Sequence, residues 1–161
     1  NTFSTNFYLN GNTADFGGSS SNGRFTLNGV VSGSGGKIVK NGTGTLWLGA
    51  TNTFTGGVTL NDGTIRMGAN QAVSSGTVTG GSFGTGTLTI NGGRIMPGGA
   101  GGLYVPTMLV SNNFSVNSGQ ASSTGDNGRL SFAGIMNLAG GTRTITIGRW
   151  TNAISTLNSG I

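Results

Sequence analysis

Three short β-strands are predicted by residues 37–67, KIVKNGTGTLWLGATNTFTGGVTLNDGTIRM. Apolar residues recur there at every second position, in the pairs Leu46/Leu48, Val58/Leu60 and Ile65/Met67. Alternation with a period of two places one face of each strand in a core. The corners fall at Asn41-Gly42, Gly56-Gly57 and Asp62-Gly63, whose residues tolerate the positive φ of tight turns. The stretch therefore predicts strand, turn, strand, turn, strand with one buried side.

The composition favours an all-β chain over a helical or a disordered one. Of 161 residues, 34 are Gly and only 7% are charged, and Glu, His and Cys are absent. Gly and Asn weaken helices, whereas Thr, Val, Ile and aromatic residues in short runs favour strands. No apolar run approaches the length of a membrane helix, and Asn1 opens directly on strand-like sequence. We therefore expect a single domain with neither a signal peptide nor a membrane-spanning segment.

Comparable strands recur at intervals of about 21 residues, which suits one coil of a β-solenoid. A longer repeat matches residues 22–31 to residues 127–136 at an offset of 105, or about five coils. The sequence thus predicts residues 1–161 to be one right-handed parallel β-solenoid of about seven or eight coils. The residues expected to point inward as ladders are Leu46, Ile65, Leu88, Val110, Phe132 and Ile147. Those expected to form outward rows are Thr45, Thr59, Thr87, Thr89, Thr144 and Thr146.

Neither end of the sequence contains charges, Pro or an amphipathic helix that could cap a solenoid. The strand-like termini include Phe7 and Leu9 at one end and Ile154 and Leu157 at the other. Because an uncapped solenoid presents open strand edges, these four residues are candidates for assembly contacts. The expected partners are identical subunits stacked head to tail as a homopolymer, or flanking repeats of a longer chain.

Residues 37–67 resemble the passenger-associated transport repeat of autotransporter β-helix proteins. The resemblance lies in Lys40-Asn41-Gly42-Thr43-Gly44-Thr45-Leu46, in Asn52-Thr53-Phe54-Thr55-Gly56-Gly57 and in Gly63-Thr64-Ile65. Ile65 replaces the usual Leu of the family pattern, and Asp62 stands where a small residue is common. The resemblance implies an exported bacterial passenger at the cell surface or outside the cell, with adhesion, surface coating or aggregation as its usual roles. It supplies no catalytic residues.

An enzymatic role is not expected, because the only carboxylates are Asp15, Asp62 and Asp126. Glycoside hydrolysis needs two carboxylates about 5–10 Å apart. Asp62 and Asp126 lie about three coils apart, or about 14 Å along the axis. A Ser or Thr nucleophile would have no His to activate it. Three scattered Asp residues, without His or Cys, also predict no metal site and no cofactor.

The net charge of +5 is dispersed, and solubility is its simplest explanation, so no nucleic-acid partner is expected. Arg24, Arg66 and Arg129 are nevertheless separated by 42 and 63 residues, which are multiples of the coil. They could form a sparse positive stripe that binds an anionic glycan. Trp47 and Trp150 are expected to face outward or lie at corners, where aromatic rings can stack on sugars. The two functions to weigh are a structural fibre or adhesin and, as the alternative, a carbohydrate-binding or, less favoured, carbohydrate-degrading module.

Overall fold

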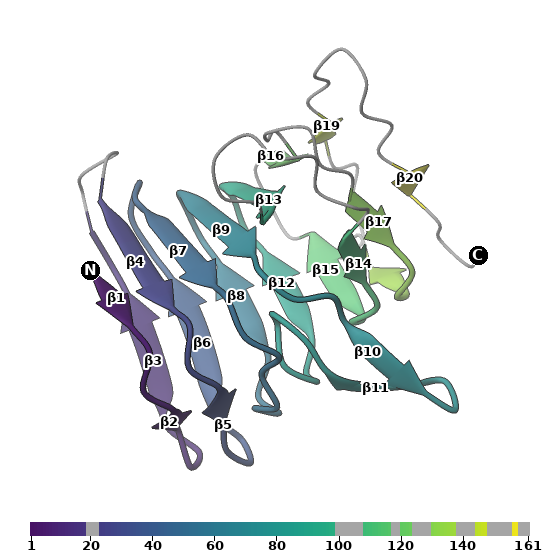
Figure 1. Cartoon of the computed structure of the whole chain (residues 1–161). Coiled ribbons are helices and arrows are strands. Elements are labelled where there is room, and N and C mark those ends of the chain that lie inside the picture. The colour runs from purple at the N-terminus through teal and green to yellow at the C-terminus, as the bar shows by residue number, and fades with distance from the viewer. Residues whose placement is uncertain are drawn as a thin grey trace.

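A computed structural model describes residues 1–18, 23–98, 108–116, 120–123, 130–137, 144–147 and 156–157, and every regular element in them is a β-strand. The strands lie side by side in successive layers along one axis, as Figure 1 shows. Every strand pairing between successive turns of the described residues is parallel, and an isolated antiparallel bridge joins Asn52 to Gly81. The expected all-β parallel solenoid is therefore confirmed.

The chain visits three sides in turn. The first is a seven-stranded sheet of β1 (Thr2–Phe3), β4 (Arg24–Leu27), β7 (Thr45–Leu48), β9 (Thr64–Met67), β13 (Arg94–Pro97), β16 (Gln120–Ser123) and β19 (Thr144–Ile147). The second is a six-stranded sheet of β3 (Thr13–Phe16), β6 (Lys37–Lys40), β8 (Val58–Leu60), β12 (Leu88–Ile90), β15 (Phe114–Val116) and β18 (Met136–Asn137). The third side contains β2 (Phe7–Tyr8) with β5 (Val31–Ser32), and β14 (Met108–Val110), β17 (Leu130–Phe132) and β20 (Thr156–Leu157).

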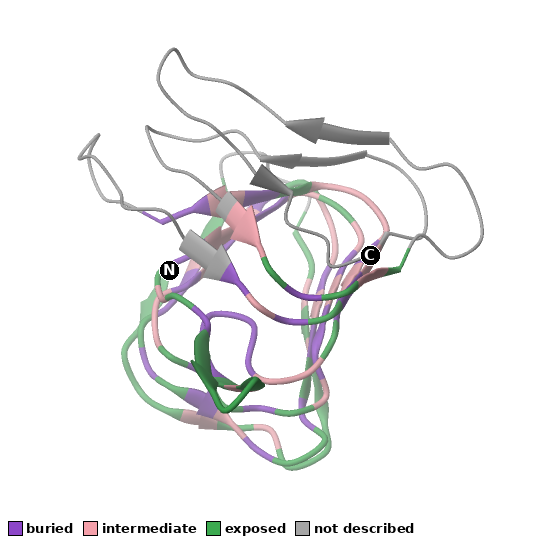
Figure 2. Cartoon of the chain, turned by 90° about the vertical axis from the view of Figure 1, so that its right-hand side faces the viewer, coloured by how far each residue is buried: buried purple, intermediate pink, exposed green. Residues whose placement is uncertain are grey.

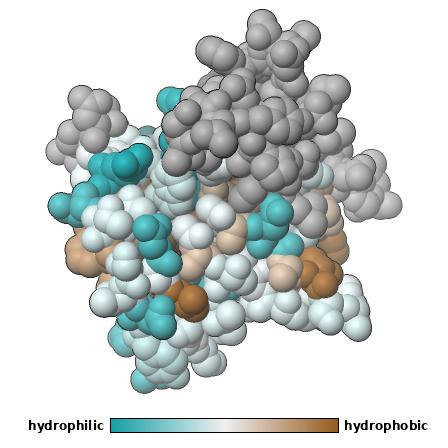
Figure 3. Space-filling view, viewed as in Figure 1, coloured by the Kyte–Doolittle hydropathy of each residue, from teal (hydrophilic) through white to brown (hydrophobic). Residues whose placement is uncertain are grey.

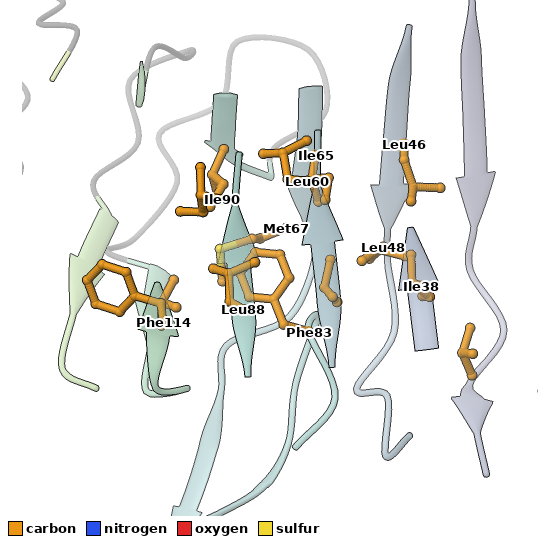
Figure 4. Packing of buried hydrophobic residues seen from close by; sticks show 14 of the residues in the cluster. Ile38, Leu46, Leu48, Leu60, Ile65, Met67, Phe83, Leu88, Ile90 and Phe114 are labelled. Carbon is orange, nitrogen blue, oxygen red and sulfur yellow. The ribbon is translucent and has the colours of Figure 1, made fainter. Parts of the chain in front are cut away.

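The hydrophobic core lies between these sides, where inward residues of successive turns stack on one another (Figure 2). In the seven-stranded sheet Phe25, Leu46, Ile65 and Ile95 are register partners, and so are Leu27, Leu48 and Met67. Figure 4 shows Leu46, Leu48, Ile65 and Met67 of these rows facing the inward row of the six-stranded sheet, which includes Ile38, Leu88 and Phe114. Parallel pairing keeps like positions in line, so the apolar alternation of each turn extends the same core.

The structure corrects which strands stack on which. Leu88 was expected in the same series as Ile65, but it pairs with Val58 and Phe114 in the six-stranded sheet. The register partner of Ile65 is Ile95, 30 residues further on. The two copies of the long repeat likewise contribute strands to different sheets, β4 to the seven-stranded sheet and β17 to the third side. Period-two alternation identifies the inward face of a strand but not the side of the solenoid to which it belongs.

An inserted hairpin explains the long interval between Ile65 and Ile95. It consists of β10 (Ala72–Ser74) and β11 (Thr77–Gly80), an antiparallel pair that projects from the stack in Figure 1. The buried side chain of Gln71 fixes its base: Nε2 donates to the carbonyl of Gly84 at 2.8 Å, and Oε1 accepts from the Phe83 amide at 3.1 Å. Buried Ser82 Oγ accepts from the amides of Gly68 and Ala69. The parallel register resumes after the hairpin.

The predicted corner glycines have the expected backbone conformation. The φ angles of Gly42, Gly57 and Gly63 are +69°, +83° and +73°. At Gly57 an added Cβ would lie 2.2 Å from the carbonyl oxygen of Thr87 in the next turn. Both the positive φ and the close approach of neighbouring turns therefore require Gly here.

Polar side chains stack along the corner that follows the six-stranded sheet. Asn41, Asn61 and Asn91 come directly after β6, β8 and β12. Asn61 Nδ2 donates to Asn41 Oδ1 at 2.7 Å, and Asn91 Nδ2 donates to Asn61 Oδ1 at 2.6 Å. Asn41 Nδ2 in turn donates to both carboxylate oxygens of Asp15 at 2.9 Å. This chain of hydrogen bonds satisfies amide groups along the axis and helps to hold the turns in register.

Candidate functional site

Three arginines lie on the outward face of the seven-stranded sheet. Trp47 and Arg66 are register partners in one outward row, between Thr26 and Met96. The neighbouring outward row consists of register partners on successive strands, in the order Arg24, Thr45, Thr64 and Arg94. Arg24 and Arg66 were expected from the sequence to share a face, whereas Arg94 was not among the candidates. Arg129, Trp150 and Asp126 lie outside the described residues.

The ring of Trp47 contacts two of these arginines. The guanidinium carbon of Arg66 lies 5.0 Å from the ring centroid, and that of Arg24 lies 5.8 Å from it. Each distance is within the range of a cation–π interaction, which favours Trp and Arg above other pairs. These contacts restrict the conformations of both guanidinium groups.

The three arginines border a shallow hollow of about 480 Å³. Its lining comprises Arg24, Thr43, Thr45, Thr64, Arg66, Arg94 and Met96. Arg24 and Arg94 are exposed, whereas Arg66 and Trp47 are half-buried. We call this set, with Trp47, the arginine face. Figure 3 views the molecule from the side of Figure 1 and shows hydrophilic and neutral side chains broken only by small hydrophobic patches.

The described acidic residues, Asp15 on β3 and Asp62 after β8, lie away from the arginine face, near Lys40. Lys40 occupies an inward position on β6, between Phe16 and Leu60 in register, and is only 3% exposed. Its ammonium donates to the carbonyls of Asn41 at 2.6 Å and Gly42 at 2.5 Å, and more weakly to that of Asp62 at 3.4 Å. Desolvation lowers the pKa of Lys40 below its ordinary 10.5, against the opposing attraction of Asp62 and Asp15. Lys40 was not among the site residues expected from the sequence, although its alternation with Ile38 indicates an inward position.

A second candidate site is the edge formed by the first turn. Phe3, Phe7, Phe16 and Phe25 pack together there, with ring centroids 4.9–6.1 Å apart. Phe7 and Leu9 are partly buried against the core, and Phe3 remains 39% exposed. At the other end of the strand order, Leu157 lies in β20 and pairs with Phe132 of β17. Ile154 lies outside the described residues.

Within the described part of the chain, no cluster of three or more His, Cys, Asp or Glu side chains could hold a metal ion. No helix long and apolar enough to cross a membrane occurs in the same residues.

The geometry places the chain among the parallel β-solenoids. Residues 38–67, which form β6 to β9, match the family model of the passenger-associated transport repeat. This stretch thus contains a repeat of the type found in autotransporter passengers, and that repeat family indicates a surface or secreted location. Comparison with curated proteins and with solved structures found no match.

Proposed function

We propose that this chain is a structural rod of an exported bacterial surface protein, and that it lengthens into a fibre or adhesin stalk by axial stacking of identical chains. The repeat family supports export, and the continuous parallel ladders support a rod. A rod of this kind presents polar outward rows, such as Thr59 and Thr89, while its backbone groups bond to the turns above and below.

The observation that carries axial stacking is the edge of the first turn. Among the described residues, no strand pairs with the outer side of β1, β2 or β3, so their ladder groups are available. The partly exposed rings of Phe3, Phe7 and Phe16 lie on the same edge as the end of the inward row. An added parallel turn would extend the ladders and cover this apolar surface. A second copy supplies such a turn at its opposite end, where β20 follows β17.

Electron microscopy of dilute, purified protein tests the proposal. Stacked chains give fibres with an axial repeat close to the length of one chain. A double variant, Phe7→Lys with Leu157→Lys, places charge at both ends and should abolish fibres. Tyr8→Lys is the matched control for the Phe7 substitution, because Tyr8 is 70% exposed on the same short strand and its replacement adds the same single charge.

Two results contradict axial self-assembly. Wild-type protein that remains as short separate rods would assign the first-turn edge to flanking repeats of one longer polypeptide. Normal fibres from the double variant would show that these ends are not the contact. A glycan array and a reducing-sugar assay test the alternative of a carbohydrate-binding or carbohydrate-degrading module, which is supported if the protein binds or cleaves glycans but forms no fibres.

A further inference from the structure

The arginine face is independent of the stacking edges, and its composition indicates a ligand of its own. We propose that it binds a linear acidic polysaccharide, whose carboxylate or sulfate groups lie along the rod axis. The residues that contact the acidic groups are Arg24, Arg66 and Arg94, and Trp47 positions the first two. Because the face lies on an outward side, this binding does not depend on fibre formation.

The register sets the spacing of the positive charges. Arg24 lies on β4, Arg66 two strands further along on β9, and Arg94 on the next strand, β13. With about 4.8 Å between neighbouring strands, the charges are staggered by about 10 Å and then about 5 Å along the axis. The hollow runs beside them and is lined by Thr hydroxyls as well as guanidinium groups. A chain of sugar rings with regularly placed acidic groups matches an elongated, polar and weakly concave surface of this kind.

Trp47 makes the arginines better receptors for oxyanions. A guanidinium presents its N–H groups in its own plane, in a fork that matches carboxylate or sulfate oxygens. Contact with an aromatic ring occupies the apolar face of the guanidinium and leaves the in-plane N–H groups as the binding edge. Because Trp47 contacts both Arg24 and Arg66, the conformational entropy lost on binding is smaller than for free side chains.

The distribution of charge favours an acidic ligand over a neutral one. Asp15 on β3 and Asp62 at the corner after β8 both lie near Lys40, and neither lines the hollow. The face therefore combines three positive side chains with hydroxyl groups from Thr43, Thr45 and Thr64. Single-stranded nucleic acid is a poorer fit, because it binds through bases stacked on open aromatic faces. Here the guanidinium groups of Arg24 and Arg66 lie over the Trp47 ring.

Binding of polygalacturonate and dextran sulfate to the purified chain tests the proposal, with neutral dextran and single-stranded DNA as comparison ligands. We expect both acidic polysaccharides to bind, with affinity that falls as salt rises. Arg24→Gln and Arg94→Gln should each weaken binding about tenfold, the effect of losing one charge-assisted contact. Lys37→Gln removes the same charge from an exposed position on the six-stranded sheet and should change affinity little.

A second comparison separates geometry from charge. The triple variant Arg24→Lys, Arg66→Lys, Arg94→Lys keeps the net charge but loses the planar fork, and it should bind several-fold more weakly than wild type. Far-UV circular dichroism and thermal melting of every variant confirm that the fold is intact. The proposal is overturned if Lys37→Gln weakens binding as much as Arg94→Gln, if the triple Lys variant binds as wild type does, or if single-stranded DNA or neutral dextran binds equally well.

Discussion

Replacing Lys40 by Met is the sharpest test of how the repeat is held together. Met keeps most of the aliphatic stem that packs between Phe16 and Leu60 but removes every N–H donor. The ammonium of Lys40 donates to two carbonyls at 2.6 and 2.5 Å and to a third at 3.4 Å. These carbonyls belong to two successive corners, at Asn41-Gly42 and at Asp62, so the side chain links adjacent turns.

The expected loss is about 2 kcal/mol in the free energy of unfolding at neutral pH. Each of the two closely bonded carbonyls costs about 1–3 kcal/mol if it stays buried without a donor. Removal of the charge returns part of this, because burial of an ammonium is itself unfavourable. The lowered pKa of Lys40 shows that desolvation outweighs the attraction of Asp62 and Asp15. The loss therefore comes from the missing donors, not from the missing charge.

The pH dependence has a defined sign. Since the folded-state pKa of Lys40 is below the ordinary 10.5, the unfolded chain binds more protons in the window just below pH 10.5. Stability contributed by Lys40 therefore rises as pH increases through that window, and the neutral amine still donates hydrogen bonds. The difference in stability between wild type and Lys40→Met should therefore widen as the pH rises toward 10.5.

Urea unfolding followed by tryptophan fluorescence measures both effects. Lys37→Met is the control: it makes the same chemical change at an exposed position of the same strand and should shift stability by less than about 0.5 kcal/mol. If Lys40→Met is as stable as wild type, Lys40 does not stabilise the corners. A gap that narrows as pH rises would show that the charge itself is stabilising.

Three further outcomes are expected. Leu46→Ala, at a fully buried core position, should cost about 2–5 kcal/mol in a thermal or urea melt, and a loss below about 1 kcal/mol would argue against the tight inward row. Asn52→Ala should cost about 1–3 kcal/mol, because the buried amide accepts from the Val31 N–H at 2.8 Å and donates to the Ser82 carbonyl at 3.0 Å. Replacement of residues 73–79 by a short Gly-Ser turn should leave circular dichroism and fibre formation unchanged, since the hairpin lies outside the parallel ladders; loss of the fold would assign it a structural role.

Short-range alternation predicted three of the four strands that residues 37–67 form. β7, β8 and β9 contain the predicted apolar pairs, whereas β6 was not predicted, because the charged residue Lys40 takes the inward position two residues after Ile38. Gly42, Gly57 and Gly63 have the positive φ expected of them. These features are local, because a strand has only two faces and a tight corner imposes its own backbone geometry.

The order in which strands of successive turns stack was harder to predict from the sequence. A constant interval of about 21 residues leads from Arg66 to Thr87, whereas the strand that follows β9 in its sheet begins at Arg94. The hairpin that lengthens this turn, AVSSGTVTG, has the composition of an ordinary strand and turn, so nothing local marks it as an insertion. The arginine face was therefore only partly visible in the sequence. The third arginine, Arg94, joins this face because the parallel pairing of β13 with β9 resumes after the hairpin.

That restored register has a functional consequence. Inward positions such as Leu46 must hold apolar residues that fill the core. Corner positions such as Gly57 must hold residues small enough for neighbouring turns to approach. Outward positions have neither constraint on residue type. An insertion between two sides of the solenoid also leaves the next strand in register with the strand of the preceding turn. Arg94 remains in line with Thr64 although the hairpin lies between them in sequence. A solenoid of this kind can therefore acquire a charged outward face and a projecting hairpin while the rod beneath them stays the same.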